Sequence, residues 1–229
     1  MKRVATQSAL VLSALLALGF STIAAAGSLP PLETGDIVFQ NSASGARDAI
    51  MLASRTQYTH VGLVEIDAAG RAVVIEAVGP VRTIALEDWI RKGRGHRVTI
   101  KRIKGLTGSE AAQAVARARH YMGRPYDHYF YESRDRIYCS ELIHAAFKEG
   151  ASISVGREER LSDLNIGNAA ARKLIRKRWR SHPLCQAKGA ATFERCLPLI
   201  LEQTLVTPAS IAADQRMELV YTDFGPDAE

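Results

Sequence analysis

The sequence predicts an α+β fold in which an antiparallel sheet packs against helices. Two β-rich runs, 58–66 and 71–78, flank residues 67–70 (Asp-Ala-Ala-Gly), a pattern typical of a β-hairpin with a glycine-containing loop. Helical patterns with capping and stop residues follow further along the chain, and no internal repeat is present. The 229 residues, 47% of them hydrophobic, are enough to bury a core, which excludes disordered, collagen-like and small disulfide-rich proteins.

The beginning of the chain has the features of a secretory signal peptide. Two basic residues precede an apolar run over 9–20, and alanines at 24–26 provide the small residues that signal peptidase requires. The apolar run is shorter than the roughly 20 residues that span a bilayer. We therefore expect residues 1–26 to be cleaved near Ala26 and residues 27–229 to be exported, most simply to a bacterial periplasm.

The other expected elements follow from local signals in chain order. Thr107 or Ser109 can cap a helix that Gly123 and Pro125 end. Short β-rich runs elsewhere are bounded by glycine or charged residues. The expected strands are 37–39, 98–103 and a final strand around 218–221, and the expected helices are 46–54, 110–122 and a helix from near Cys139 to Gly150.

A basic amphipathic helix is predicted over 169–180. This segment contains six basic residues and no acidic residue, and its apolar residues recur at helical spacing. One interpretation is that the apolar side packs on the core while the charges face water, and the other is contact with an anionic cell-wall polymer or membrane surface. The basic residues are Arg172, Lys173, Arg176, Lys177, Arg178 and Arg180.

Three cysteines follow the expected cleavage site, and two of them can pair. Cys185 and Cys196 lie close together in a segment, 182–197, that has proline near both ends and little periodic pattern. We expect them to close a short loop as a disulfide in an oxidising compartment, within a basic insertion over about 157–200. Cys139 is then left unpaired and needs its own explanation.

Cys139 is the candidate nucleophile. Apolar residues follow it at positions three, four, seven and eight further on, so the cysteine shares the buried face of its helix and lies in the first turn. The positive end of the helix dipole and the unpaired backbone N–H groups favour a thiolate there and can stabilise an oxyanion. The plainer interpretation is a small hydrophobic core residue.

His60 is the candidate base, because it lies in a strand of otherwise apolar residues. A hairpin loop with an odd number of residues places His60 and Glu76 on the same face of neighbouring strands. Glu76 can then orient the imidazole, while the other ring nitrogen faces Cys139. We expect Gly62, on the same face, to leave space for a substrate. The alternatives are a satisfied core histidine and a solvated carboxylate.

Several segments together resemble a known family. They are GDIVF at 35–39, THVGLV at 59–64, Glu76, GRPYD at 123–127 and YCSEL at 138–142. With the histidine before the cysteine, this order resembles the circularly permuted papain-like, NlpC-type cysteine amidases of the YaeF/YiiX branch. The resemblance spans about 35–150, with a weaker echo at 207–210 and in the final strand, and it does not cover 151–200. It implies a circularly permuted papain-like fold.

The resemblance also implies a thiol hydrolase. Cys139 would be the nucleophile, His60 the general base and then acid, and Glu76 the orienting residue, with water resolving an acyl-enzyme. The third position varies in type among related permuted enzymes, so Glu65 or Asp67 is an alternative to Glu76, although Glu65 has the wrong parity to share a face with His60.

Tyrosines cluster in the sequence around the proposed site. Tyr58, Tyr126 and Tyr138 are the candidates for lining a substrate pocket or donating a hydrogen bond to an oxyanion, and Tyr129 lies beside them. The alternative for each is ordinary packing in the core.

The expected reaction is hydrolysis of an amide or ester bond in a cell-wall peptide or a lipid-linked amide. The alternatives are a lipid acyltransferase and a non-catalytic module that binds a fatty acid or lipid. No cysteine or histidine pair has zinc-ligand spacing, so we expect no metal and no other cofactor. The net charge of +6 lacks the density typical of nucleic-acid-binding proteins, so we expect no nucleic acid partner.

Overall fold

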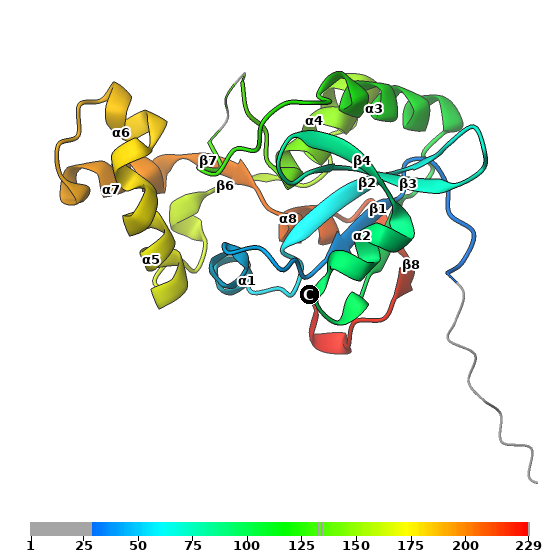
Figure 1. Ribbon diagram of the computed structural model, residues 1–229, viewed down its shortest axis with the longest axis horizontal. Helices are drawn as coiled ribbons and strands as arrows, with labels where there is room; N and C mark the ends of the chain where they lie inside the picture. Colours follow the sequence, from blue (N-terminus) through cyan, green and yellow to red (C-terminus); the bar gives the residue numbers. More distant parts are fainter. Residues whose placement is uncertain (1–28, 132, 134, 229) are drawn as a thin grey trace, which may run out of the picture.

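The computed structural model describes residues 29–131, 133 and 135–228. At its centre is a six-stranded antiparallel sheet with the strand order β4-β3-β2-β1-β5-β8 (Figure 1). The predicted signal peptide, residues 1–26, lies outside the described residues. The strands are β1 (Ile37–Gln40), β2 (His60–Ile66), β3 (Ala72–Ala77), β4 (Val81–Ala85), β5 (Thr99–Ile103) and β8 (Met217–Thr222).

The β2–β3 hairpin determines which residues share a face of the sheet. Ile66 pairs with Ala72, so the loop holds the five residues 67–71. The Asp67 carboxylate accepts two hydrogen bonds from backbone N–H groups of this loop, which fixes its geometry. Because the number of loop residues is odd, even-numbered residues of the two strands lie on the same face.

Helices cover both faces of this sheet. α3 (Gly108–His120) and α4 (Cys139–Ala151) pack on one face, where Leu63 belongs to the larger buried cluster. On the other face, Trp89 of α2 (Leu86–Lys92) packs in a second buried cluster. The structure is thus α+β with helices against an antiparallel sheet, as predicted.

Of the two candidate caps for α3, the structure uses Thr107, because the Thr107 hydroxyl and the Glu110 carboxylate accept hydrogen bonds from each other's backbone N–H groups. Other local predictions were wrong in detail. This helix ends at His120, two residues before the expected end. Neither β4 nor α2 was predicted. The remaining helices of the sheet domain are α1 (Arg47–Ser54) and α8 (Pro208–Ala212).

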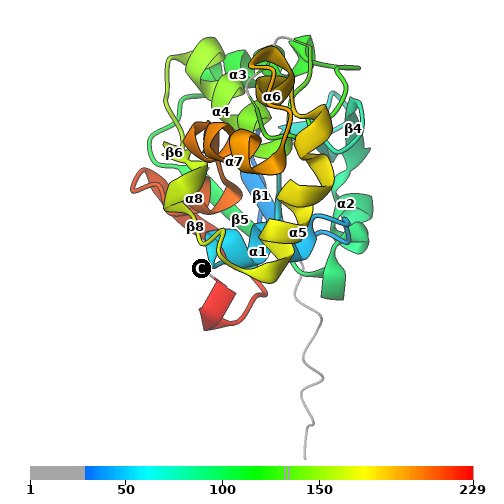
Figure 2. The ribbon, with the colours of Figure 1, turned by 90° about the vertical axis from the view of Figure 1, so that its left-hand side faces the viewer.

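Residues 158–206 form short elements at one end of the molecule (Figures 1 and 2). α5 packs against α1, and β6 pairs with β7. The expected loop at 182–197 instead contains two short helices. None of the helices within the described ranges is long and apolar enough to cross a membrane. The elements are β6 (Glu158–Arg160), α5 (Ala169–Arg178), α6 (Pro183–Ala187), α7 (Phe193–Glu202) and β7 (Thr204–Val206), with 3-10 turns at Leu161–Asp163 and Trp179–Ser181.

A disulfide between Cys185 and Cys196 joins α6 to α7. The two half-cystines and Ile200 form a small buried cluster that is separate from the main core, with Ile175 and Trp179 packed against it. So few buried residues stabilise this end of the molecule only weakly, and the disulfide adds to their contribution.

Candidate active site

The thiol of Cys139 lies at the first residue of α4, and it is the one free cysteine in the described chain. Leu142, Ile143 and Ala146 on the same side of the helix are fully buried against the sheet, which fixes the orientation of the first turn. Cys139 itself is buried, and the first N–H groups of the helix are close to its thiol. Cys139 therefore lies in the first turn of its helix and on the buried face, as predicted.

The structure brings His60 and Glu76 together with this thiol. His60 is the first residue of β2, and its Nε2 lies 2.7 Å from Oε2 of Glu76 on β3. The side chain of His60 also makes a hydrogen bond with Cys139. Since Nε2 is bonded to Glu76, the nitrogen left for the thiol is Nδ1. The imidazole ring additionally stacks on Trp89 of α2, with ring centroids 5.9 Å apart.

Arg82 extends this arrangement, and the sequence analysis missed it. Its Nε and Nη2 donate to Oε1 of Glu76 at 3.0 and 2.8 Å, so each Glu76 oxygen has its own partner. Arg82 is directly opposite Glu76 in the β3–β4 register. The signal that was available is the alternation of residues 81–85 directly after a Gly-Pro turn, which marks a third strand of the meander.

The electrostatics favour an ion pair between cysteine and histidine. Burial alone would lower the pKa of His60, but hydrogen bonds and charges from Cys139 and Glu76 outweigh it and raise the pKa to about 10. Burial alone would raise the pKa of Cys139, yet the hydrogen bond and charge of His60 lower it overall. For Glu76 too, His60 and then Arg82 outweigh burial and lower the pKa. These opposite shifts favour a thiolate beside an imidazolium.

The three candidate tyrosines occupy different positions. The Tyr126 hydroxyl lies 4.0 Å from Sγ of Cys139, and burial raises its pKa well above the ordinary value, so it remains a hydrogen-bond donor. The Tyr138 ring lines a pocket beside the thiol, but its hydroxyl accepts a hydrogen bond from the Val206 backbone N–H. The Tyr58 hydroxyl forms a hydrogen bond with the hydroxyl of Thr99 on β5 at 2.9 Å.

The structure also bears on two further expectations, the open space at Gly62 and the alternatives to Glu76. A Cβ on Gly62 would lie 2.3 Å from Cγ1 of Val74, so this glycine permits close packing and does not open space for a substrate; that expectation was wrong. The alternative third residues both have other partners. Glu65 forms a two-pronged ion pair with Arg119, and Asp67 holds the hairpin loop.

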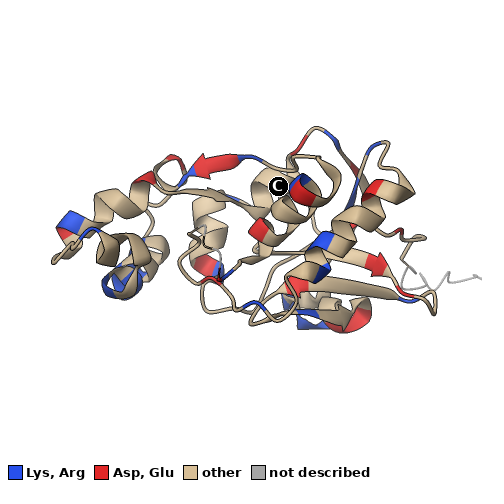
Figure 3. Cartoon of the chain, turned by 90° about the horizontal axis from the view of Figure 1, so that it is seen from above, with Lys and Arg blue, Asp and Glu red and all other residues tan. Residues whose placement is uncertain are grey.

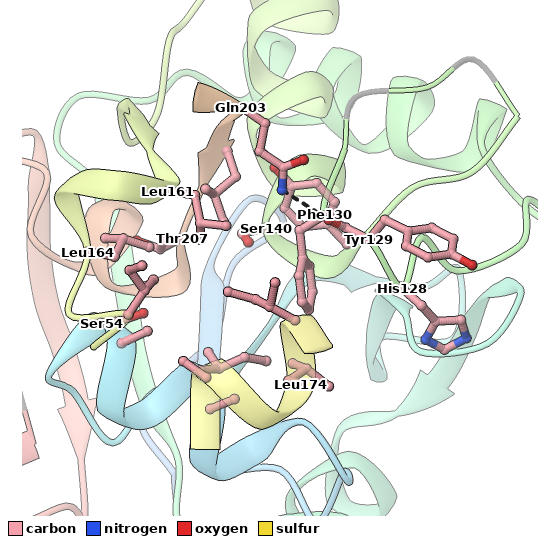
Figure 4. A pocket seen from close by; sticks show the side chains of 18 of the residues that line it. Ser54, His128, Tyr129, Phe130, Ser140, Leu161, Leu164, Leu174, Gln203 and Thr207 are labelled. Carbon is pink, nitrogen blue, oxygen red and sulfur yellow. Dashed lines mark hydrogen bonds between the residues drawn. The ribbon is translucent and has the colours of Figure 1, made fainter. Parts of the chain in front are cut away.

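An apolar pocket begins at Cys139 and Ser140 (Figure 4). Its volume is about 90 Å³, and it lies between α4 and the short elements of residues 158–206. Tyr129 also lines it, and its carbonyl oxygen accepts a hydrogen bond from Gln203. The apolar lining includes Ile50, Phe130, Leu161, Leu174, Ile200 and Leu205.

A second recess, which we call the basic groove, lies on the side of His60. It has a volume of about 520 Å³ and is lined by Tyr126 as well as His60. Its basic lining residues are Lys173, Lys177 and Arg178 of α5. Throughout the described part of the chain, no group of three or more His, Cys, Asp or Glu side chains is placed to hold a metal ion.

Comparisons with known proteins show the family and the fold of this chain. The model of a family described as permuted papain-like amidase enzyme, YaeF/YiiX, C92 family, matches residues 31–221. The uncharacterized protein YiiX of Escherichia coli K12 is 34% identical over 180 residues, which cover 78% of this chain and 81% of that protein. A crystal structure from Escherichia coli O157:H7, titled as the metalloprotein yiiX, DUF1105, superposes with a TM-score of 0.73 at 28% identity, covering 84% of this chain and 98% of that one.

Proposed function

The chain belongs to the permuted papain-like amidase family of the YaeF/YiiX type, and on this basis we propose that it hydrolyses an amide or ester bond through Cys139, His60 and Glu76. The observation that carries the proposal is the buried contact between these three side chains, which lowers the pKa of the cysteine and raises that of the histidine. A thiolate beside an imidazolium is the reactive form of a cysteine nucleophile.

The reaction proceeds in two balanced halves. The Cys139 thiolate attacks the carbonyl carbon, and as the resulting oxyanion collapses, the bond to the leaving nitrogen or oxygen breaks while His60 donates its proton to that atom. Water then gives a proton to His60 and attacks the thioester. The second collapse releases the acid and returns the electron pair to sulfur, so the thiolate and the imidazolium are restored.

Stabilisation of the oxyanion is assigned to groups around the start of α4. The backbone N–H of Cys139 belongs to the first turn and has no partner within the helix. The protonated hydroxyl of Tyr126, 4.0 Å from the sulfur, is the second donor in this proposal. Glu76 acts through His60, because it holds the imidazole in one orientation and stabilises its positive charge.

The apolar pocket favours a lipid-linked amide or ester over a cell-wall peptide. A peptide backbone carries polar N–H and C=O groups that such a lining leaves without partners, whereas an alkyl chain is stabilised by burial. The same pocket would serve a lipid acyltransferase or a non-catalytic binder of a fatty acid or lipid. A hydrolase differs from both because it releases free acid in the absence of an acyl acceptor.

Export is also part of the proposal. The Cys185–Cys196 disulfide fits an oxidising compartment such as a periplasm, which the sequence also indicates through its signal peptide pattern. The basic residues of 169–180, which include Arg172, Arg176 and Arg180, would then face an anionic cell-wall or membrane surface.

The deciding experiment compares wild type with Cys139→Ala on octanoyl 4-nitroanilide and 4-nitrophenyl octanoate. We expect free octanoate from wild type and a loss of at least about a thousandfold in kcat/KM for the variant, because the covalent step is removed. Intact-mass analysis of wild type after a short exposure to the ester should reveal one octanoyl group, on Cys139. Retained hydrolysis by a folded Cys139→Ala protein would contradict the assignment.

A further inference from the structure

The two recesses that meet at the catalytic pair have different chemistry. Cys139 lines the apolar pocket, whereas His60 lines the basic groove. Helix α5 borders both, since Leu174 and Arg178 contribute to both linings. The pair therefore sits at a boundary between an apolar site and a positively charged one.

The reaction chemistry assigns one part of a substrate to each recess, provided that the proposed hydrolase function holds. The acid that protonates a leaving atom must be within hydrogen-bond reach of it, so the leaving group lies on the His60 side. The carbonyl carbon must lie at the sulfur, so the acyl part continues into the pocket that Cys139 lines. The basic groove is thus the site of the leaving group.

Acids compensate the charges of the groove only in part, since Asp127 acts electrostatically on Arg178 but the two lysines have no acidic partner in the described part of the chain. Lys173 and Lys177 are exposed and one helical turn apart on α5, and no acidic side chain among the described residues pairs with either. Arg178 is half-buried, and its guanidinium donates to the backbone carbonyl of His128. The acidic residue in the groove lining, Asp48, is already paired with Arg47 of α1.

The basic residues of the groove determine which kind of ligand it can bind. Figure 3 shows a block of basic residues within the end of the molecule that α5 to α7 form. Two ammonium groups and a guanidinium around one recess match a carboxylate or a phosphate, because charge-assisted hydrogen bonds are the stronger ones. We propose that the basic groove binds an anionic group on the leaving part of the substrate, so that the substrates are acyl compounds with a negatively charged leaving group.

The test uses pairs of substrates in which one member carries the anionic group and the other does not. N-octanoylglycine is compared with neutral N-octanoylglycinamide, and N-octanoylphosphoethanolamine with neutral N-octanoylethanolamine. For wild type we expect kcat/KM to be at least about tenfold higher for the anionic member of one pair or both, mainly through KM. Whichever pair responds identifies carboxylate or phosphate as the recognised group.

The variants separate a specific site from general attraction. In Lys173→Gln/Lys177→Gln the preference should fall to about twofold or less, because kcat/KM of the anionic member decreases more than that of its neutral counterpart. Arg172→Gln is the matched control, because it removes a charge from the same helix but does not line the groove. An equal effect of Arg172→Gln would overturn the proposal in favour of bulk attraction of anions.

A binding measurement keeps this inference separate from the proposed function. Cys139→Ala is titrated with N-octanoylglycine and N-octanoylglycinamide by calorimetry, with and without the two lysine substitutions. Tighter binding of the anion, lost with the lysines, supports the groove even if no hydrolysis is found. Equal binding of both compounds overturns the groove assignment, while octanoate release that depends on Cys139 would still support the hydrolase.

Discussion

At the scale of single residues, the site depends on a chain of charged groups that crosses three strands, β2, β3 and β4. Glu76 gives one carboxylate oxygen to His60 and the other to Arg82, so its orientation is fixed from both sides. His60 and Glu76 are buried, whereas the Arg82 side chain is 42% exposed. Because water can compensate an exposed charge but not a buried one, the loss of Glu76 should affect His60 much more than Arg82.

We predict that Glu76→Gln shifts the pH dependence of hydrolysis. The raised pKa of His60, about 10, lies on the alkaline side, so kcat/KM of wild type should fall above about pH 10 as His60 loses the proton for the leaving group. The lowered pKa of Cys139 sets the acid limb, below which the thiolate is protonated. Without the Glu76 charge, the alkaline limb of the kcat/KM profile should shift to lower pH by about one unit or more.

The control for this prediction is Glu65→Gln, which removes a carboxylate of the same strand pair that binds Arg119 instead. Its pH profile should match wild type. The rate of iodoacetamide labelling of Cys139 is measured alongside, since it follows the thiolate alone and should remain high above pH 10. An alkaline limb that stays in place in Glu76→Gln would exclude Glu76 as the partner of the imidazolium.

Sequence patterns located Cys139, His60 and Glu76 because helical and strand periodicities determine which side chains share a face. The same reasoning could not find Arg82, since its role depends on a neighbouring strand that was not predicted. It also misjudged Gly62. Whether a strand residue is odd- or even-numbered determines which face of the sheet it lies on. Whether there is free space on that face at Gly62 depends on the packing of Val74.

At the scale of elements, long periodic segments were predicted better than short ones. α4 begins and the hairpin pairs where the patterns indicate, because each buries a continuous apolar face. The short helices α6 and α7 were expected to be a loop. Helices of this length are marginal by themselves in water, so their stability comes from tertiary contacts and the disulfide, which leave little periodic signal in the sequence.

We predict that Cys185→Ser/Cys196→Ser loosens this end of the molecule while the sheet remains folded. Closing a loop of this length contributes about 3 kcal/mol, and the lost contribution should appear as local opening of α6 and α7. Hydrogen exchange should therefore increase in 183–202 and stay near wild type in β1 to β3. Labelling of Cys139 is the control for the intact core. Unchanged exchange in this segment would mean that the cluster around Ile200 suffices without the disulfide.

At the scale of the whole molecule, the site lies where the sheet domain meets the elements of 158–206. The sheet and α4 supply the cysteine and histidine, while α5, α7 and β7 close the apolar pocket. The sequence predicted both the α+β domain and the basic helix, but not that the apolar side of this helix would wall a pocket. Contacts between distant segments of a chain are not encoded in local periodicity.

The size of this pocket leads to a prediction about acyl chain length. Because the pocket is finite, kcat/KM for N-acylglycines should rise with each methylene added to an acetyl group and then level off, once further carbons extend beyond the pocket. Each buried methylene contributes about 0.8 kcal/mol, so the rise should be roughly threefold to fourfold per methylene. Leu164→Trp, which fills the pocket far from the basic groove, should shift the optimum to shorter chains without changing the preference for an anionic leaving group. A rate independent of chain length in wild type would show that the acyl part does not enter this pocket, and would return a peptide to consideration as the substrate.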